Sequence, residues 1–241
     1  MKHEYRIEKE ITSVEVDYNL ECKLSYIFQM LQEVSYYQSE EMGFGKKDTI
    51  DKNLHWVITR FDVEIIRIPK YGDKITVVTY PGEYNPLFYY RHYYIEDNRH
   101  NIILKAVSLW AVIDNATHMI KKDAFNGLKI PVVHKEGELR LPGKINDRSA
   151  STLTHKSTIK YSDIDLNNHL NNTRYIELIQ DALPLEFFKE NTLTFISINY
   201  LAELKVNDEV SVYTSNSNPI TILGKKEDKE HFVASLSYKK R

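Results

Sequence analysis

The sequence has one cysteine, few glycines and no long apolar run, and each shortage excludes a class of protein. Cys22 stands alone among 241 residues, which excludes an intrachain disulfide and an all-cysteine zinc site. The 8 glycines against 17 tyrosines favour strands over glycine-rich phosphate loops. No apolar stretch approaches the length of a membrane span, and the charged start MKHEYRIEKE lacks a signal-peptide core. We therefore expect a cytoplasmic protein without a membrane span.

An excess of positive charge is missing as well. The chain has 32 Lys and Arg against 34 Asp and Glu, a net charge of −2, whereas nucleic-acid-binding domains are usually strongly basic. The run FYYRHYYI (88–95) could stack bases, but alternating aromatic residues are also ordinary strand material. The Gly-x-Ser-x-Gly elbow, the Walker lysine loop and the His-Glu-x-x-His pair are absent. No nucleic-acid partner and no cofactor are expected.

The order of predicted elements repeats once along the chain. In the first half, an alternating segment over residues 14–23 predicts a strand, and apolar residues at helical spacing predict a helix over residues 24–42. The strands expected next are 54–67, 74–81, 87–96 and 102–113. The second half has an extended segment over residues 152–161, and Asn172 can cap a helix that continues to about Phe187. Its expected strands are 193–202, 209–215, 219–225 and 231–239.

The repeat predicts an α+β fold in which each half is a long helix wrapped by an antiparallel sheet. The residues from Gly72, GDKITVVT, match those from Asn207, NDEVSVYT. Pairing the two halves edge to edge would cover their open strands. We expect a first domain over residues 1–130, a linker over 131–152 and a second domain over 153–241. The linker carries a small excess of positive charge, which suits solvation or weak attraction for an acidic partner.

Polar residues gather immediately before the second predicted helix, in YSDIDLNNHLNNTRYIEL (161–178). Asp165, Asn167 and His169 place a base, an amide and an imidazole within five residues. A helix start offers free N–H groups and a positive dipole end to an oxygen that gains negative charge. Two other interpretations stay open here: ordinary capping and turn formation, and a metal site built from Asp163, Asp165 and His169.

Four segments carry a resemblance to a known family. They are NLHWVITRFDVEIIRIPKYGD (53–73), SLWAVID (108–114), SDIDLNNHLNNTRYIEL (162–178) and INYLAELKVNDEV (198–210). With these segments the chain resembles the acyl-acyl-carrier-protein thioesterases of the bacterial type, which are tandem hotdog folds. The resemblance implies hydrolysis of fatty acyl-acyl-carrier-protein thioesters, the step that ends fatty-acid elongation. It implies the acyl carrier protein as partner and no metal, and it leaves a homodimer open.

The resemblance also assigns residues. Asp165, Asn167 and His169 fall on the family's catalytic aspartate, asparagine and histidine, and Glu203 falls on its catalytic glutamate in a later strand. Leu204 stands where plant enzymes have a cysteine, so a cysteine role there is excluded.

The expected chemistry is attack of water on a thioester carbonyl. Helix amides near Asn171 and Asn172 would polarise the carbonyl. Glu203, or Asp165 with help from His169, would activate the water, and covalent attack by Asp165 is the alternative.

The first half repeats the motif incompletely. Asp17 and Asn19 stand at the positions of Asp165 and Asn167, but Glu21 replaces the histidine. We therefore expect the first half to be inactive and to supply the acyl-chain pocket. Its expected lining residues are Ile27, Phe28, Met30 and Leu31.

Two rival functions use the same residues. An acyl-coenzyme A thioesterase would differ in how the carrier docks, and a non-catalytic hotdog protein would bind acyl thioesters as a sensor. The presence of Asp165, His169 and Glu203 together favours an enzyme. A dehydratase is disfavoured, because the His-Phe-Pro-Gly signature is absent.

Overall fold

One antiparallel sheet of eleven strands spans both halves in the computed structural model, which describes residues 3–125 and 130–241. Strands of the first half are β1 (Tyr5–Glu10), β2 (Leu54–Ile65), β3 (Lys74–Tyr84), β4 (Tyr89–Asp97), β5 (Ile102–Asp114) and β6 (Met119–Ile120). Those of the second are β7 (Thr152–Thr158), β8 (Asn191–Tyr200), β9 (Glu209–Thr214), β10 (Ile220–Lys226) and β11 (Lys229–Lys240). Their order is β1-β3-β4-β5-β2-β8-β11-β10-β9-β7, with β6 beside β5. The second five strands mirror the first five, as the repeat requires.

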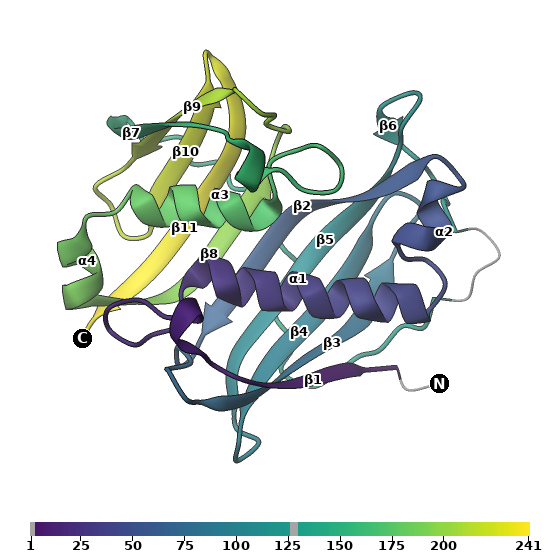
Figure 1. Ribbon diagram of the computed structural model, residues 1–241, viewed down its shortest axis with the longest axis horizontal. Helices are drawn as coiled ribbons and strands as arrows, with labels where there is room; N and C mark the ends of the chain where they lie inside the picture. The colour runs from purple at the N-terminus through teal and green to yellow at the C-terminus, as the bar shows by residue number, and fades with distance from the viewer. Residues whose placement is uncertain (1–2, 126–129) are drawn as a thin grey trace.

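Two long helices lie on the same face of this sheet (Figure 1). They are α1 (Leu24–Glu41) and α3 (Asn172–Asp181), and each is followed by a short helix, α2 (Lys46–Ile50) or α4 (Leu185–Glu190). The residues of α1 and α3 with no exposed surface are Ile27, Leu31, Ile176 and Ile179. They belong to one hydrophobic core shared by both halves. Burial of this apolar stripe, rather than helix propensity, holds each helix on the sheet.

The two halves join where β2 pairs with β8 (Figure 1). Phe61 faces Ile198 and Val63 faces Ile196 across this junction, and all four side chains are almost fully buried. The pairing satisfies two strand edges that would otherwise be open. The domain limits 1–130, 131–152 and 153–241 stay a prediction, because the sheet and its core run through the junction without a break.

The linker between the halves crosses the sheet on the face opposite the helices. Arg60 donates to the carbonyl of Pro142, and Asn199 donates to that of Gly143. These two side chains alternate with Phe61 and Ile198, which face the helices, so the linker lies on the other side. The start of the connection, residues 126–129, lies outside the described part of the chain.

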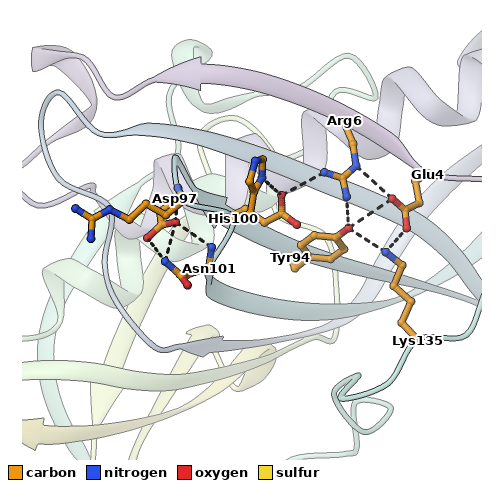
Figure 2. A network of polar contacts seen from close by, with 9 residues as sticks. Glu4, Arg6, Tyr94, Asp97, His100, Asn101 and Lys135 are labelled. Atoms are coloured by element: carbon orange, nitrogen blue, oxygen red, sulfur yellow. Dashed lines mark hydrogen bonds and ion pairs between the residues drawn. The ribbon is translucent and has the colours of Figure 1, made fainter.

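A polar network fastens both β1 and the linker to β4 (Figure 2). The Arg6 guanidinium donates to the Tyr94 hydroxyl at 2.7 Å and lies 3.2 Å from the Glu96 carboxylate. Lys135, from the linker, donates to the same hydroxyl at 2.9 Å and forms an ion pair with Glu4. The positive charge of Lys135 is therefore paired with Glu4 within the chain and is not free for an acidic partner.

One strand and one helix end predicted from the sequence are wrong. Residues 14–23 form a short 3-10 turn (Ser13–Glu15) and a tight loop instead of a strand, and the apolar Tyr18 is exposed. The first strand is β1, which was not predicted. The helix predicted to reach Phe187 ends at Asp181, because Pro184 stands where an interior N–H would be needed.

Replacing Gly224 by alanine is expected to destabilise the second half. A Cβ atom at this position of β10 would lie 1.9 Å from a ring carbon of Phe232, which is fully buried. Overpacking of this kind costs about 1–3 kcal/mol, which corresponds to a fall of roughly 2–12 °C in Tm for a chain of this size. Gly143→Ala is the control, since a Cβ there meets nothing within 4 Å. Equal melting temperatures of the two variants would contradict this packing.

Candidate active site

The polar segment before α3 folds into a tight loop closed on the Asp165 carboxylate. Its Oδ1 atom accepts the backbone N–H groups of Asn167 at 2.8 Å and His169 at 3.3 Å. The Asp165 N–H donates to the His169 carbonyl at 2.8 Å. At the loop tip Asn168 adopts a φ of +63°, a conformation that asparagine tolerates better than most residues. Asp165 therefore shapes the loop that presents Asn167 and His169.

The first half contains the same loop with different chemistry. Asp17 accepts the N–H groups of Asn19 at 2.8 Å and Glu21 at 3.1 Å, which repeats the Asp165 geometry. Glu21, at the position of His169, forms ion pairs with Arg241 and, at 3.6 Å, with Lys70. The backbone of the repeat is thus preserved, while the imidazole is replaced by a carboxylate engaged in structural pairs.

His169 contacts Glu203, the residue that the family resemblance assigns to the same site. The Nε2 atom of His169 lies 3.0 Å from Oε2 of Glu203, and Lys205 Nζ lies 3.1 Å from the other oxygen, Oε1. Glu203 does not lie in a strand: β8 ends at Tyr200, and the glutamate belongs to the irregular segment that follows.

The electrostatics give the pair distinct protonation states. Burial lowers the pKa of His169, and the negative charges of Glu203 and Asp165 offset this only in part. Burial raises the pKa of Glu203, but the hydrogen bond from Lys205 and the charges of His169 and Lys205 outweigh it, so that pKa lies below its usual range. At pH 7 an ionised carboxylate therefore lies 3.0 Å from Nε2 of a neutral imidazole. Its Nδ1 lone pair remains able to accept a proton.

The start of α3 lies directly after this loop. The Asn171 side chain accepts the N–H of Thr173 at 2.9 Å, so Asn171 is the capping residue and the cap predicted at Asn172 is wrong by one position. Among the described residues, the backbone N–H of Asn172 has no hydrogen-bond acceptor. A free N–H at the positive end of a helix is suited to an oxygen that carries developing negative charge.

A pocket connects this loop with the first half of the chain. Asp165, Asn167, Asn171 and Asn172 form part of its wall. The phenylalanine, tyrosine and tryptophan residues of the wall all come from the first half and are Tyr36, Phe44, Trp56, Tyr84, Tyr89, Tyr90 and Trp110. Such a site, largely apolar with a few polar groups at one place, is typical of small-molecule pockets.

The four residues predicted to line an acyl pocket do not line this one. Ile27, Phe28, Met30 and Leu31 lie in the hydrophobic core between α1 and the sheet. The pocket meets a different face of α1, formed by Gln32, Ser35, Tyr36 and Ser39. Contact of the four core residues with a ligand stays a prediction without support from this pocket.

Sequence reasoning missed two residues beside the loop. Lys46, from α2, donates to the side-chain oxygen of Asn167 at 2.8 Å. His55, from β2, lines the pocket, and its ring centroid lies 6.5 Å from that of His169. Both belong to the first half, more than 100 positions earlier in the chain. No local pattern marks them, because only the packing of one half against the other brings them to the site.

Two other chemistries find no support at the site. In residues 3–125 and 130–241, no group of three His, Cys, Asp or Glu side chains could hold a metal ion. The carboxylate of Asp163 instead binds the N–H of Lys160 at 2.8 Å. Outside the site, burial raises the pKa of the Cys22 thiol to about 12, so this thiol is inert. No helix in the described ranges is long and apolar enough to cross a membrane.

Relatives with known names share both halves of the chain. The family model for the acyl-ACP thioesterase N-terminal domain matches residues 2–124, and that for the C-terminal domain matches residues 146–238. An acyl-[acyl-carrier-protein] hydrolase from Cuphea viscosissima is 25% identical over 217 residues, which cover 83% of this chain and 52% of that protein. The chain spans about half the length of the plant relatives that it matches.

Solved structures share the whole architecture. The crystal structure of an acyl-ACP thioesterase from Bacteroides thetaiotaomicron has a TM-score of 0.91 at 24% identity and covers 98% of both chains. The 12:0-ACP thioesterase from Umbellularia californica has a TM-score of 0.87 at 21% identity, over 100% of this chain and 99% of that one. At these identities the likeness shows the fold, and it confirms the predicted α+β tandem hotdog. Because the two family models match both halves of the chain, the chain belongs to the acyl-ACP thioesterase family.

Proposed function

We propose that this protein hydrolyses fatty acyl-acyl-carrier-protein thioesters to a free fatty acid and the carrier protein. The observation that carries the proposal is the contact between His169 and Glu203, 3.0 Å apart, beside a loop whose Asp165 and Asn167 form part of a largely aromatic pocket. A proton acceptor, a helix start and an apolar pocket are the three parts that hydrolysis of an acyl thioester requires.

In the proposed mechanism, His169 Nδ1 takes a proton from a water molecule as that water attacks the thioester carbonyl. Glu203 fixes the ring tautomer through Nε2–H and stabilises the imidazolium that forms. The N–H of Asn172 and the start of α3 stabilise the oxyanion of the tetrahedral intermediate. When this intermediate collapses, the carbon–sulfur bond breaks and the imidazolium returns the proton to the thiolate.

Two other assignments of the base remain alternatives. Glu203 is less suited to take the water proton itself, because its two oxygens already contact His169 and Lys205. Covalent attack by Asp165 would leave an acyl-aspartate that water then opens. A single turnover in oxygen-18 water distinguishes the routes, because label in the Asp165 carboxylate arises only from the covalent one.

The acyl chain is proposed to enter the pocket toward the first half. Trp56 stacks on Phe125 at 5.2 Å and meets Tyr89 edge-on at 5.0 Å, which makes a rigid apolar surface. Such a surface can bury the methylene groups of an acyl chain, and each buried group contributes about 0.8 kcal/mol to binding. The first half therefore contributes substrate binding while the second contributes the chemistry.

The test is release of free acid from a panel of acyl-carrier substrates, from C8 to C18. The same acyl group attached to coenzyme A is measured in parallel. A higher kcat/KM on the carrier-protein substrate is the expected result, and a higher value on coenzyme A would make this an acyl-coenzyme A thioesterase. Tight binding of acyl thioester without turnover would instead identify a sensor. The cytoplasmic location and a homodimer stay predictions from the sequence.

Activity is expected to fall at acidic pH with a midpoint below the ordinary histidine value of about 6.5. The reason is that burial lowers the pKa of His169, so the neutral ring that accepts a proton persists to lower pH. A profile of kcat/KM against pH measures this midpoint. A midpoint clearly above 6.5 would mean that His169 is not the group that titrates.

Two variants are expected to move this midpoint in opposite directions. The negative charge of Glu203 raises the pKa of His169, so Glu203→Gln moves the midpoint to lower pH. The positive charge of Lys205 lowers the same pKa, so Lys205→Met moves the midpoint to higher pH. Shifts of the same sign in both variants would contradict the electrostatic arrangement described for this pair.

A further inference from the structure

The short helix α2 brings a lysine from the first half to the active-site loop of the second. Lys46, the first residue of α2, lines the pocket together with Asp165 and Asn167. Its backbone is firmly placed: the Lys46 N–H donates to the Glu40 side chain at 2.6 Å. A Cβ on the preceding Gly45 would lie 2.6 Å from that same side chain, so the chain passes close to α1 here. The position of Lys46 is therefore set by α1 and α2, independently of the loop that it contacts.

The contact between Lys46 and Asn167 determines which way the asparagine amide faces. Lys46 Nζ lies 2.8 Å from Oδ1 of Asn167. An ammonium group can only donate, so the amide oxygen must face the lysine and the amide NH₂ must face away from it. The opposite orientation would set two donors against each other. In the described part of the chain, Lys46 forms no ion pair with a carboxylate, so Asn167 Oδ1 is the acceptor that holds it.

This arrangement gives Asn167 a defined chemical role. Its side-chain oxygen is occupied by Lys46, and its backbone N–H is occupied by Asp165 at 2.8 Å. What the side chain can still offer within the pocket is its pair of N–H donors. The oxygen of a thioester carbonyl or of an attacking water can accept a hydrogen bond from these donors.

We propose that Lys46 is a positioning residue, which fixes the Asn167 amide so that its NH₂ group serves the reacting thioester. The proposal rests on the proposed thioesterase function and adds to it a dependence of the second-half site on the first half. Lys46 does not touch the reacting atoms in this role, and it acts through Asn167.

A double-mutant cycle on kcat tests the proposal directly. Lys46→Met is expected to lower kcat roughly ten- to hundredfold, since it removes a charge-assisted hydrogen bond, with little change in KM. Asn167→Ala is expected to lower kcat at least as much. In the Asn167→Ala background, Lys46→Met is then expected to cost less than about twofold, because the group through which it acts is already gone.

Two further variants separate positioning from general effects. Lys46→Arg keeps a cationic donor and is expected to restore most of the kcat lost in Lys46→Met. Lys47→Met removes the neighbouring lysine, whose side chain is 89% exposed, and is expected to leave kcat unchanged. Thermal unfolding of all variants checks that the fold is kept.

Each contrary outcome has one meaning. If Lys46→Met costs the same factor with and without Asn167, or raises KM alone, Lys46 does not act through Asn167 and the proposal is wrong. If Lys46→Arg is as impaired as Lys46→Met in a folded protein, the donor role is wrong. A wild-type protein that hydrolyses no acyl thioester would overturn the proposed function, and this inference with it.

Discussion

Asp165→Asn is expected to lower kcat by about a hundredfold or more while the protein stays folded. Asparagine keeps a side-chain oxygen that can accept the N–H groups of Asn167 and His169, so the loop survives. The lost negative charge is one that favours the protonated form of His169, and this form must appear in the transition state. If Asp165 is instead the nucleophile, the loss of activity is larger still.

The repeat supplies a matched control for this variant. Asp17→Asn makes the same change in the first-half loop, which has the same hydrogen bonds. That loop has Glu21 where the second-half loop has His169. The melting temperature of Asp17→Asn is expected to change as much as that of Asp165→Asn, and its kcat is expected to stay at the wild-type value. Equal loss of kcat in both variants would mean that the loop carboxylates matter only for folding.

His169→Ala is expected to lower kcat by roughly 10²–10⁴, the range that removal of a general acid–base group usually costs. The fall in activity at acidic pH is expected to disappear with it, because the titrating imidazole is gone. Steady-state kinetics across pH measure both effects. His100→Ala serves as control, since that ring is 82% exposed on the hairpin between β4 and β5. Turnover at the wild-type rate in His169→Ala would remove the basis of the proposed mechanism.

The sequence predicted the parts of this fold that depend on local periodicity. The helix expected over 24–42 is observed over Leu24–Glu41, because its apolar stripe has the helical period and faces one core. The residues 14–23 also alternate, yet they form a loop. There the hydrogen bonds of Asp17 to two backbone N–H groups outweigh the weak preference of an alternating segment for a strand.

Spacing in the sequence groups the loop residues of the candidate site, but it does not identify the neighbouring residues from the first half. Asp165, Asn167 and His169 lie within one loop, so their spacing alone places them together. Lys46 and His55 reach the site only because β2 pairs with β8, a pairing that no short pattern encodes.

The wall of this pocket was not predicted from the sequence, for a related reason. The apolar residues of α1 face the core, whereas Gln32, Ser35 and Ser39 look like a solvated face in the sequence. Strands and loops of the same half cover that polar face and turn it into the side of a pocket. Periodicity identifies the buried stripe of a helix, but it does not show which part of the other face is enclosed.

The most direct measurement is a crystal structure of the protein with an acyl-carrier protein whose thioester is replaced by a stable amide. The amide carbonyl is predicted within hydrogen-bond distance of the Asn172 N–H, with the acyl chain running along Trp56 and Tyr89. An acyl chain lodged elsewhere, for example among Ile27 and Phe28 in the core, would contradict the proposed pocket. A carbonyl beside Asp17 in the first half would contradict the assignment of the active site.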